Sequence, residues 1–273
     1  MTILPDTTAD AAEISAPPLR TGATLITGAS SGLGRGLALA LAARGEDLAL
    51  CARRVDQLEA VRDAILGTYP GARVLLRSLD VNDHDAVFTA FRELDDALGG
   101  FERVIVNAGV GAATPVGQGG FARNRAVLET NLVAALAQCE AAVERFRARG
   151  RGHLVCMSSV SASRGLPGSL TVYAASKAGL SALAEGIRAD VRGTDLRVTT
   201  LCPGFIETEM TAGKRRPMMV DLDTGVAALL RAIDAEVPVA YLPRWPWAPV
   251  AFLMRHLPLP WVARLAGGGA LNT

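Results

Sequence analysis

The sequence has little net charge and no long basic run. Its 28 lysine and arginine residues are balanced by 27 aspartate and glutamate residues, which leaves a formal net charge of +1. A nucleic-acid-binding protein concentrates basic side chains to meet the phosphate backbone. The charge balance therefore argues against nucleic acid and favours a small molecule as the partner.

Cysteine is also scarce, with four residues in 273. Cys51, Cys156 and Cys202 stand inside apolar runs typical of strands, where a thiol acts as a small buried hydrophobe. We expect neither a disulfide framework nor a metal site, and the expected compartment is a reducing cytoplasm.

The N-terminus lacks the basic segment and apolar run of a secretory signal. It is instead polar and acidic, with prolines, between Asp6 and Pro18. Residues 1–20 are predicted to be a flexible extension.

Half of the residues are hydrophobic, so a chain of this length can bury one large core. Apolar β-branched runs alternate with amphipathic or alanine-rich stretches, which predicts an α/β fold with a doubly wound parallel sheet and helices on both faces. Strands are expected near 23–27, 47–52, 73–78, 103–106, 152–157, 196–202 and 237–242, and helices near 33–44, 55–67, 83–98, 122–149, 172–192 and 222–235. One catalytic domain is expected over residues 21–243.

A glycine-rich turn follows the first predicted strand. Gly28, Gly32 and Gly34 punctuate the sequence Gly-Ala-Ser-Ser-Gly-Leu-Gly before the first helix. Glycines let the backbone turn tightly and approach a pyrophosphate, whose charge is met by amide groups at the start of the helix. Strand, glycine turn and helix in this order predict a dinucleotide site.

Tyr173 and Lys177 are four residues apart at the start of another predicted helix, so both side chains leave the same face. A phenol has an ordinary pKa near ~10, and a nearby ammonium favours its ionised form. The pair therefore predicts a tyrosine tuned as a general acid or base.

Together these segments resemble the short-chain dehydrogenase/reductase family in its compact single-domain form. The resemblance runs from about Thr24 to Met210 and includes, in order, the glycine turn, Leu79-Asp80-Val81, Asn107-Ala108-Gly109, Asn131, Ser158-Ser159, the Tyr173 to Lys177 pair and Pro203-Gly204. It implies the strand order 3-2-1-4-5-6-7, an oxidoreductase activity with a nicotinamide cofactor, and a homodimer or homotetramer.

The resemblance also implies a set of cofactor-binding residues: Gly28, Ser30, Ser31, Gly32, Leu33, Gly34, Arg53, Asp80, Val81, Asn107, Ala108, Gly109, Tyr173, Lys177, Pro203, Gly204, Ile206 and Thr208. Ala52 stands where an acidic residue would bind the ribose of NAD. Arg53 follows it and can pair with the 2′-phosphate of NADP, so NADP (NADPH) is the expected cofactor. Arg54 is interpreted as capping the strand end in solvent.

Four residues carry the implied catalysis. Ser159 resembles the serine that binds the substrate carbonyl oxygen, Tyr173 moves its proton, and Lys177 holds the nicotinamide ribose. Asn131 resembles the residue that bends its helix and positions a water. Ser159 lies fourteen residues before Tyr173 where the family has about thirteen, so Ser158 and Ser161 stay open as substitutes.

The expected reaction is hydride transfer between the nicotinamide and a carbonyl or alcohol carbon. The segments 109–120 and 210–220 should border the substrate, and with Phe205 they offer mainly apolar side chains, which favours an apolar ketone, aldehyde or secondary alcohol. A rival of another class is a non-catalytic protein that senses NADP on the same fold.

All three tryptophans lie in a proline-rich tail, residues 244–273. Its uninterrupted apolar run of about ten residues is short of the ~20 that span a membrane. Four alternatives stay open for it: packing on the substrate cleft, packing on a second subunit, a peripheral contact with a membrane surface, or a disordered tail.

Overall fold

The computed structural model describes residues 22–111, 113–211, 213 and 217–267. The expected N-terminal extension, residues 1–20, lies outside them, as do residues 268–273 of the tail. Apolar runs of the sequence form the strands, which are β1 (Ala23–Thr27), β2 (Asp47–Ala52), β3 (Val74–Ser78), β4 (Phe101–Val106), β5 (Arg151–Met157), β6 (Asp195–Pro203) and β7 (Val239–Leu242). The central strands are buried on both faces, and the edge strands β3 and β7 are partly exposed.

All seven strands pair in parallel, in the order β3-β2-β1-β4-β5-β6-β7. The predicted fold class and strand order are thus confirmed. The chain reverses direction across the sheet between β1 and β4, and in such sheets ligands bind outside the carboxyl ends of the strands at this point.

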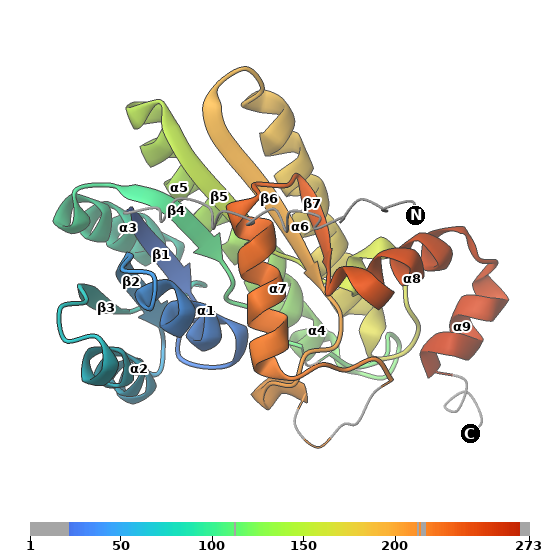
Figure 1. Ribbon diagram of the computed structural model, residues 1–273. Coiled ribbons are helices and arrows are strands. Elements are labelled where there is room, and N and C mark those ends of the chain that lie inside the picture. Colours follow the sequence, from blue (N-terminus) through green and yellow to red (C-terminus); the bar gives the residue numbers. More distant parts are fainter. Residues whose placement is uncertain (1–21, 112, 212, 214–216, 268–273) are drawn as a thin grey trace, which may run out of the picture.

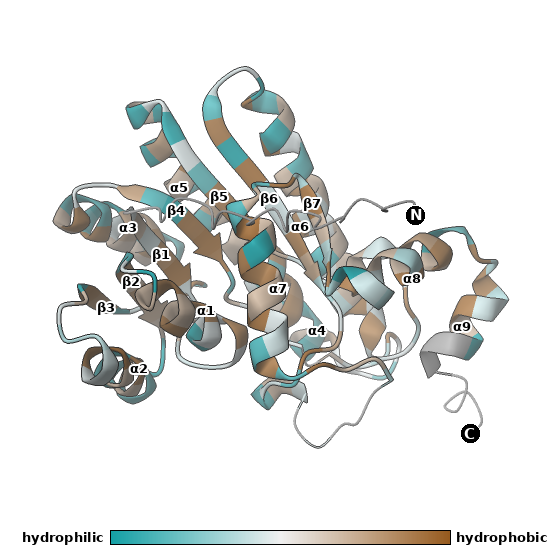
Figure 2. Ribbon diagram, in the orientation of Figure 1, coloured by the Kyte–Doolittle hydropathy of each residue, from teal (hydrophilic) through white to brown (hydrophobic). Residues whose placement is uncertain are grey.

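Helices cover both faces of the sheet (Figure 1). One apolar core joins the sheet to α3, α5 and α6, and a second joins it to α1, α2 and α7. Figure 2 shows the apolar colouring of the central strands between these layers. The helices are α1 (Gly32–Ala42), α2 (Val55–Thr68), α3 (His84–Leu98), α4 (Phe121–Leu128), α5 (Ala134–Arg149), α6 (Leu170–Asp190), α7 (Leu222–Asp234), α8 (Arg244–His256) and α9 (Leu259–Gly267).

The helix expected near 122–149 contains a π-helical turn, Glu129–Val133, between α4 and α5. Asn131 lies in this turn and is fully buried. By length and composition the stretch Phe121–Arg149 alone among the described residues could cross a membrane, and half of its apolar window is buried in the molecule, as in a core helix.

The tail contains two helices that the sequence interpretation did not anticipate. Pro246 and Pro249 lie in the first turns of α8, and Pro260 lies in the first turn of α9. The first four amide groups of a helix have no partner inside it, so proline is tolerated there. Trp245 has non-helical backbone angles and marks the kink at which the continuous part of α8 begins.

Candidate active site

The glycine turn connects β1 to α1 at the carboxyl edge of the sheet. Gly28 has φ of +64°, a region that favours glycine. A Cβ on Gly34 would lie 2.3 Å from the carbonyl oxygen of Gly28. The sequence therefore needs glycine at both positions to bring the start of α1 against the turn, which leaves backbone where a pyrophosphate would approach.

Asn107 fastens the end of β4 to this turn. Its Nδ2 donates to the carbonyl oxygens of Thr27 and Gly28 at 2.9 and 3.3 Å, and the amides of Asn107 and Ala108 both donate to Thr27 Oγ1 at 3.1 Å. The predicted cofactor residues at the ends of β1 and β4 are thus in one hydrogen-bonded unit.

The remaining predicted cofactor residues lie along the same edge. Thr208 lies beside Gly32, since a Cβ added there would be 3.5 Å from Thr208 Cβ. Ile206 is buried and Val81 is nearly so, whereas Asp80 is exposed and accepts hydrogen bonds from Asn82. Ser30 is buried and Leu33 is partly exposed, while Pro203 ends β6 and Gly204 follows it.

Arg54 was missed as a site residue. Its guanidinium donates to Ser30 Oγ at 3.1 Å and to Ser31 Oγ at 2.7 Å, and it lies 3.7 Å from the Glu209 carboxylate. It therefore folds over the glycine turn instead of only capping a strand end. Arg53 is exposed and its guanidinium makes no hydrogen bond or ion pair with the described residues. Two adjacent arginines after β2 were the available signal, and sequence alone did not say which one turns inward.

Tyr173 and Lys177 both lie on α6 and face the end of β5. The Ser159 hydroxyl lies close enough to the Tyr173 hydroxyl to lower its pKa. Ser158 is turned away, because its Oγ donates to the carbonyl oxygen of Lys177 at 3.0 Å and contacts Ser181 Oγ at 2.7 Å. Ser161 contributes only its backbone amide, which donates to Ser159 Oγ. Of the three serines, Ser159 is the one whose side chain is paired with Tyr173.

Burial raises the pKa of Tyr173 above its ordinary value, and the Ser159 hydroxyl acts in the opposite direction. The expected lowering by Lys177 is not the dominant influence on this pKa. The Lys177 ammonium donates instead to the carbonyl oxygen of Met157 at 2.8 Å. At neutral pH Tyr173 is consequently a protonated phenol, the form that can give up a proton.

Asn131 brings the loop after β4 next to Lys177. Its Oδ1 accepts from the Val110 amide at 2.8 Å, and its Nδ2 donates to the Val110 carbonyl oxygen at 2.8 Å and to Ser176 Oγ at 3.1 Å. A Cβ on Gly109 would lie 3.0 Å from Asn131 Oδ1 and 3.3 Å from Lys177 Nζ. The four predicted catalytic residues thus lie at one place on the carboxyl edge of the sheet.

Lys177 makes stability depend on pH in a defined direction. Burial lowers the pKa of its ammonium from 10.5 to about 8. Between about pH 8 and pH 10.5 Lys177 binds a proton in the unfolded chain but not in the folded protein, so raising the pH favours folding. Below about pH 8 Lys177 is protonated in both states, and the folded protein is destabilised by the full cost of burying its charge.

We therefore expect Lys177→Met to stabilise the cofactor-free protein more at pH 7 than at pH 10, with the difference shrinking by about 2 kcal/mol over this range. Groups that do not interact with Lys177 titrate alike in both proteins and cancel in the comparison, whereas Cys202 loses the influence of the Lys177 charge, which lowers its pKa. Urea unfolding of the two proteins at several pH values measures the effect, and a gap that does not change with pH would contradict it.

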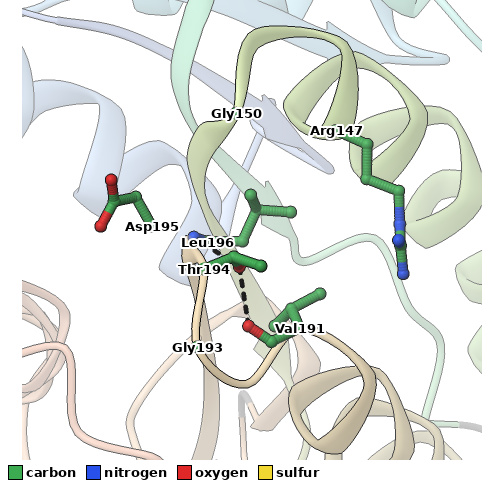
Figure 3. Close-up of a pocket in the computed structure, with 7 residues that line it drawn as sticks. All are labelled: Arg147, Gly150, Val191, Gly193, Thr194, Asp195 and Leu196. Atoms are coloured by element: carbon green, nitrogen blue, oxygen red, sulfur yellow. Dashed lines mark hydrogen bonds between the residues drawn. The ribbon is translucent and has the colours of Figure 1, made fainter.

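A separate surface hollow of about 420 Å³ lies at the opposite edge of the sheet. Figure 3 shows its lining, in which Thr194 Oγ1 donates to the Val191 carbonyl oxygen at 2.7 Å and accepts from the Leu196 amide at 3.2 Å. It is lined by the start of β6 and the end of α5, and none of the predicted site residues reaches it. Within the described residues, no group of three or more His, Cys, Asp or Glu side chains could hold a metal ion.

Comparison with known proteins gives consistent results. The sequence profile of short chain dehydrogenases matches residues 23–218. An uncharacterized oxidoreductase of Mycobacterium tuberculosis is 52% identical over 235 residues, which cover 86% of this chain and 93% of the relative. A 1-deoxy-11-beta-hydroxypentalenate dehydrogenase of Streptomyces exfoliatus is 38% identical over 215 residues, covering 77% and 76% of the two chains.

Solved structures of oxidoreductases have a similar fold. Levodione reductase superposes with a TM-score of 0.76 at 26% identity, covering 84% of this chain and 98% of that one. An alcohol dehydrogenase from the archaeon Thermococcus sibiricus, complexed with 5-hydroxy-NADP, gives a TM-score of 0.72 at 26% identity, covering 81% and 95%.

Proposed function

The chain belongs to the short-chain dehydrogenase/reductase family of oxidoreductases, and from this premise we propose that it is an NADPH-dependent carbonyl reductase. The observation that carries the proposal is the pairing of a protonated Tyr173 with Ser159, beside a buried Lys177. A proton donor and a second hydroxyl at one point suit the oxygen of a carbonyl group.

The residues present fit a nicotinamide dinucleotide. The turn at Gly28 and Gly34 leaves open backbone at the start of α1, and the positive end of that helix favours a pyrophosphate. Asn107 and Gly109 would border the ribose at the end of β4, and Gly204 and Thr208 the nicotinamide. When bound, the cofactor supplies the hydride.

Side chains of the protein then bind and protonate the carbonyl oxygen of the substrate. Ser159 orients it by donating a hydrogen bond, and Tyr173 donates its proton to the developing alkoxide. The Lys177 ammonium, shielded from water, favours the phenolate that remains. Asn131 holds Gly109 and the loop that follows it in place beside Lys177. The raised pKa keeps Tyr173 protonated at neutral pH, which is the form required of the acid in the reduction.

We propose a preference for NADP over NAD because of the residues at the end of β2. Ala52 offers no carboxylate to the adenosine ribose, and the exposed Arg53 guanidinium has no ion pair with any residue that the structure describes. Arg54 adds a second positive charge over Ser30 and Ser31. The complex of the related Thermococcus sibiricus enzyme with 5-hydroxy-NADP is in keeping with this preference.

We expect NADPH to bind more tightly than NADH, and Arg53→Ala to remove most of the difference, about 1–3 kcal/mol for a charged hydrogen-bonded contact. Arg54→Ala is the matched comparison, because this side chain already has partners on the glycine turn. Titration calorimetry with NADPH and NADH measures the dissociation constants of each protein. Equal dissociation constants in the unaltered protein would contradict the assignment of NADP, and a larger loss in Arg54→Ala would move the phosphate contact to Arg54.

The substrate is proposed to be an apolar ketone or aldehyde. Met210 lies beside Gly111 across the cleft, since a Cβ there would be 3.0 Å from Met210 Sδ. Val116, Met210 and Met218, in the segments predicted to border the substrate, are exposed and could cover an apolar compound. The pentalenate dehydrogenase among the relatives acts, by its name, on a hydroxylated compound.

A panel of carbonyl compounds graded in polarity, followed by NADPH oxidation, tests the proposal. Turnover should rise with the apolar character of the ketone or aldehyde. If no carbonyl compound were reduced while NADPH still bound, the non-catalytic alternative would replace this one. A cytoplasmic location and a homodimer or homotetramer also stay proposals.

A further inference from the structure

The tail helices α8 and α9 carry large apolar side chains on their outer surface. Trp245, Phe252, Leu253, Leu259 and Trp261 are each between 52% and 79% exposed. We call these five residues the outer face. Soluble surfaces seldom gather so many large apolar side chains on two consecutive short helices, and such a cluster marks a contact with a partner or a lipid.

A different set of residues holds these helices to the body of the protein. Trp247 is buried and its ring meets the Phe205 ring edge-on at 5.1 Å, while Ala251 and Val262 are also buried. At the end of α8, Arg164 donates to the carbonyl oxygens of Met254, at 3.2 Å, and Leu257. Packing on the body of the protein therefore uses Trp247, Ala251 and Val262, whereas the side chains of the outer face stay exposed, with the Phe252 ring against the His256 ring of the same helix.

Charge identifies the chemistry of the partner. From Val237 to the end of the chain the sequence contains no aspartate or glutamate. Arg244, Arg255 and Arg264 are exposed beside the outer face and form no ion pair with the described residues. Aromatic and apolar side chains bordered by unpaired arginines match a bilayer surface that carries anionic headgroups.

The arginines and the helix lengths argue against two other arrangements, a contact with a second copy of the chain and a membrane-spanning helix. A second copy docked on the same face by twofold symmetry would bring three guanidinium groups near three others. Neither helix can span a bilayer, because α8 has 13 residues and α9 has 9, against about 20 that are needed. Both can lie in the plane of the interface.

We propose that the outer face of α8 and α9 docks on an anionic lipid bilayer. In Figure 1 the two helices project at the end of the molecule nearest the catalytic helix α6, and Arg164 ties them to the loop that follows Ser159. Docking would bring the mouth of the cleft to the lipid surface, where an apolar substrate is concentrated. The lipid contact itself does not depend on the proposed reaction.

Cosedimentation of the full-length protein with vesicles tests the proposal. Vesicles of equal parts phosphatidylcholine and phosphatidylglycerol should retain the protein at low salt and release much of it at high salt, and pure phosphatidylcholine should retain far less. Phe252→Ser with Trp261→Ser should weaken retention on the order of 100-fold. Arg255→Gln with Arg264→Gln should weaken it about 30-fold, at roughly fivefold per charge.

Tyr69→Ser and Arg192→Gln are matched controls, since both residues are exposed away from the tail. They should bind vesicles as the unaltered protein does. The catalytically impaired Tyr173→Phe variant should also bind normally, which separates this proposal from the proposed reaction. NADPH binding by each variant confirms that it is folded.

Three outcomes would overturn the proposal. They are no retention on anionic vesicles, equal retention on neutral and anionic vesicles, and retention unaffected by the tail substitutions. If the unaltered protein ignored vesicles and the Phe252→Ser, Trp261→Ser variant had a lower sedimentation mass, the outer face would be an interface between copies of the chain.

Discussion

Tyr173→Phe should lower turnover at least about 100-fold, the typical contribution of a positioned general acid, while NADPH still binds. The substitution removes only the phenolic hydroxyl and keeps the ring within its packing. Steady-state rates with an accepted ketone and a separate binding titration measure the two quantities. Near-normal turnover would rule out Tyr173 as the proton donor.

Serine variants sharpen this result. Ser159→Ala removes the hydroxyl paired with Tyr173 and should also reduce turnover strongly. Ser161→Ala changes a side chain that makes no hydrogen bond among the described residues, and should have little effect. A greater loss in Ser161→Ala than in Ser159→Ala would show that the extra residue in the loop before Tyr173 shifts the catalytic serine.

Asn131→Leu should lower the free energy of unfolding by about 2–4 kcal/mol and also impair turnover. The side chain is fully buried, and its loss would remove two hydrogen bonds from the Val110 amide and carbonyl groups and a third from Ser176 Oγ. Each buried polar group left without a partner costs about 1–3 kcal/mol. Denaturant unfolding and the rate with NADPH report the two effects.

Gln138→Leu is the matched control for this substitution. Gln138 is equally buried on α5, but only its Nε2 is paired, with the Ala134 carbonyl oxygen, and its Oε1 has no partner among the described residues. Replacing it by a hydrocarbon side chain of similar size should change stability by less than about 1 kcal/mol. Equal losses in the two variants would show that Asn131 contributes only as a buried amide.

The sequence was sufficient for the fold because its strands are continuous apolar runs and its glycines fall directly after β1. Both patterns are set by residues that are neighbours in the sequence. The order of the strands in the sheet was predicted from the family resemblance. The tail was less predictable. No helix was predicted there because the tail is rich in proline, yet Pro246 and Pro260 lie in first turns, where a missing amide does no harm, and α8 continues through Pro249. A count of prolines does not show their position within a helix.

The site was predictable as a set of residues and less so in its electrostatics. Spacing put Tyr173 and Lys177 on one helix face, but it could not show that Lys177 would donate to the Met157 carbonyl group. The pKa of Tyr173 is governed mainly by burial, a property of the whole fold. Arg54 was overlooked for the same reason, since its direction depends on the side chains of Ser30 and Ser31 across the sheet edge. The assigned roles of these residues stay predictions until the variants are measured.

Helix α8 is attached at its two ends to two different loops at the carboxyl edge of the sheet. Near its start, Trp247 packs so closely on Gly204 that a Cβ there would lie 2.0 Å from the indole ring, and at its end Arg164 holds the last carbonyl groups. Gly204 belongs to the loop after β6 and Arg164 to the loop after β5. The helix therefore bridges the two loops, with Ala251 buried between its two attachments. Since the loop after β6 is proposed to border the nicotinamide, we expect substitutions in this helix to change which compounds are accepted.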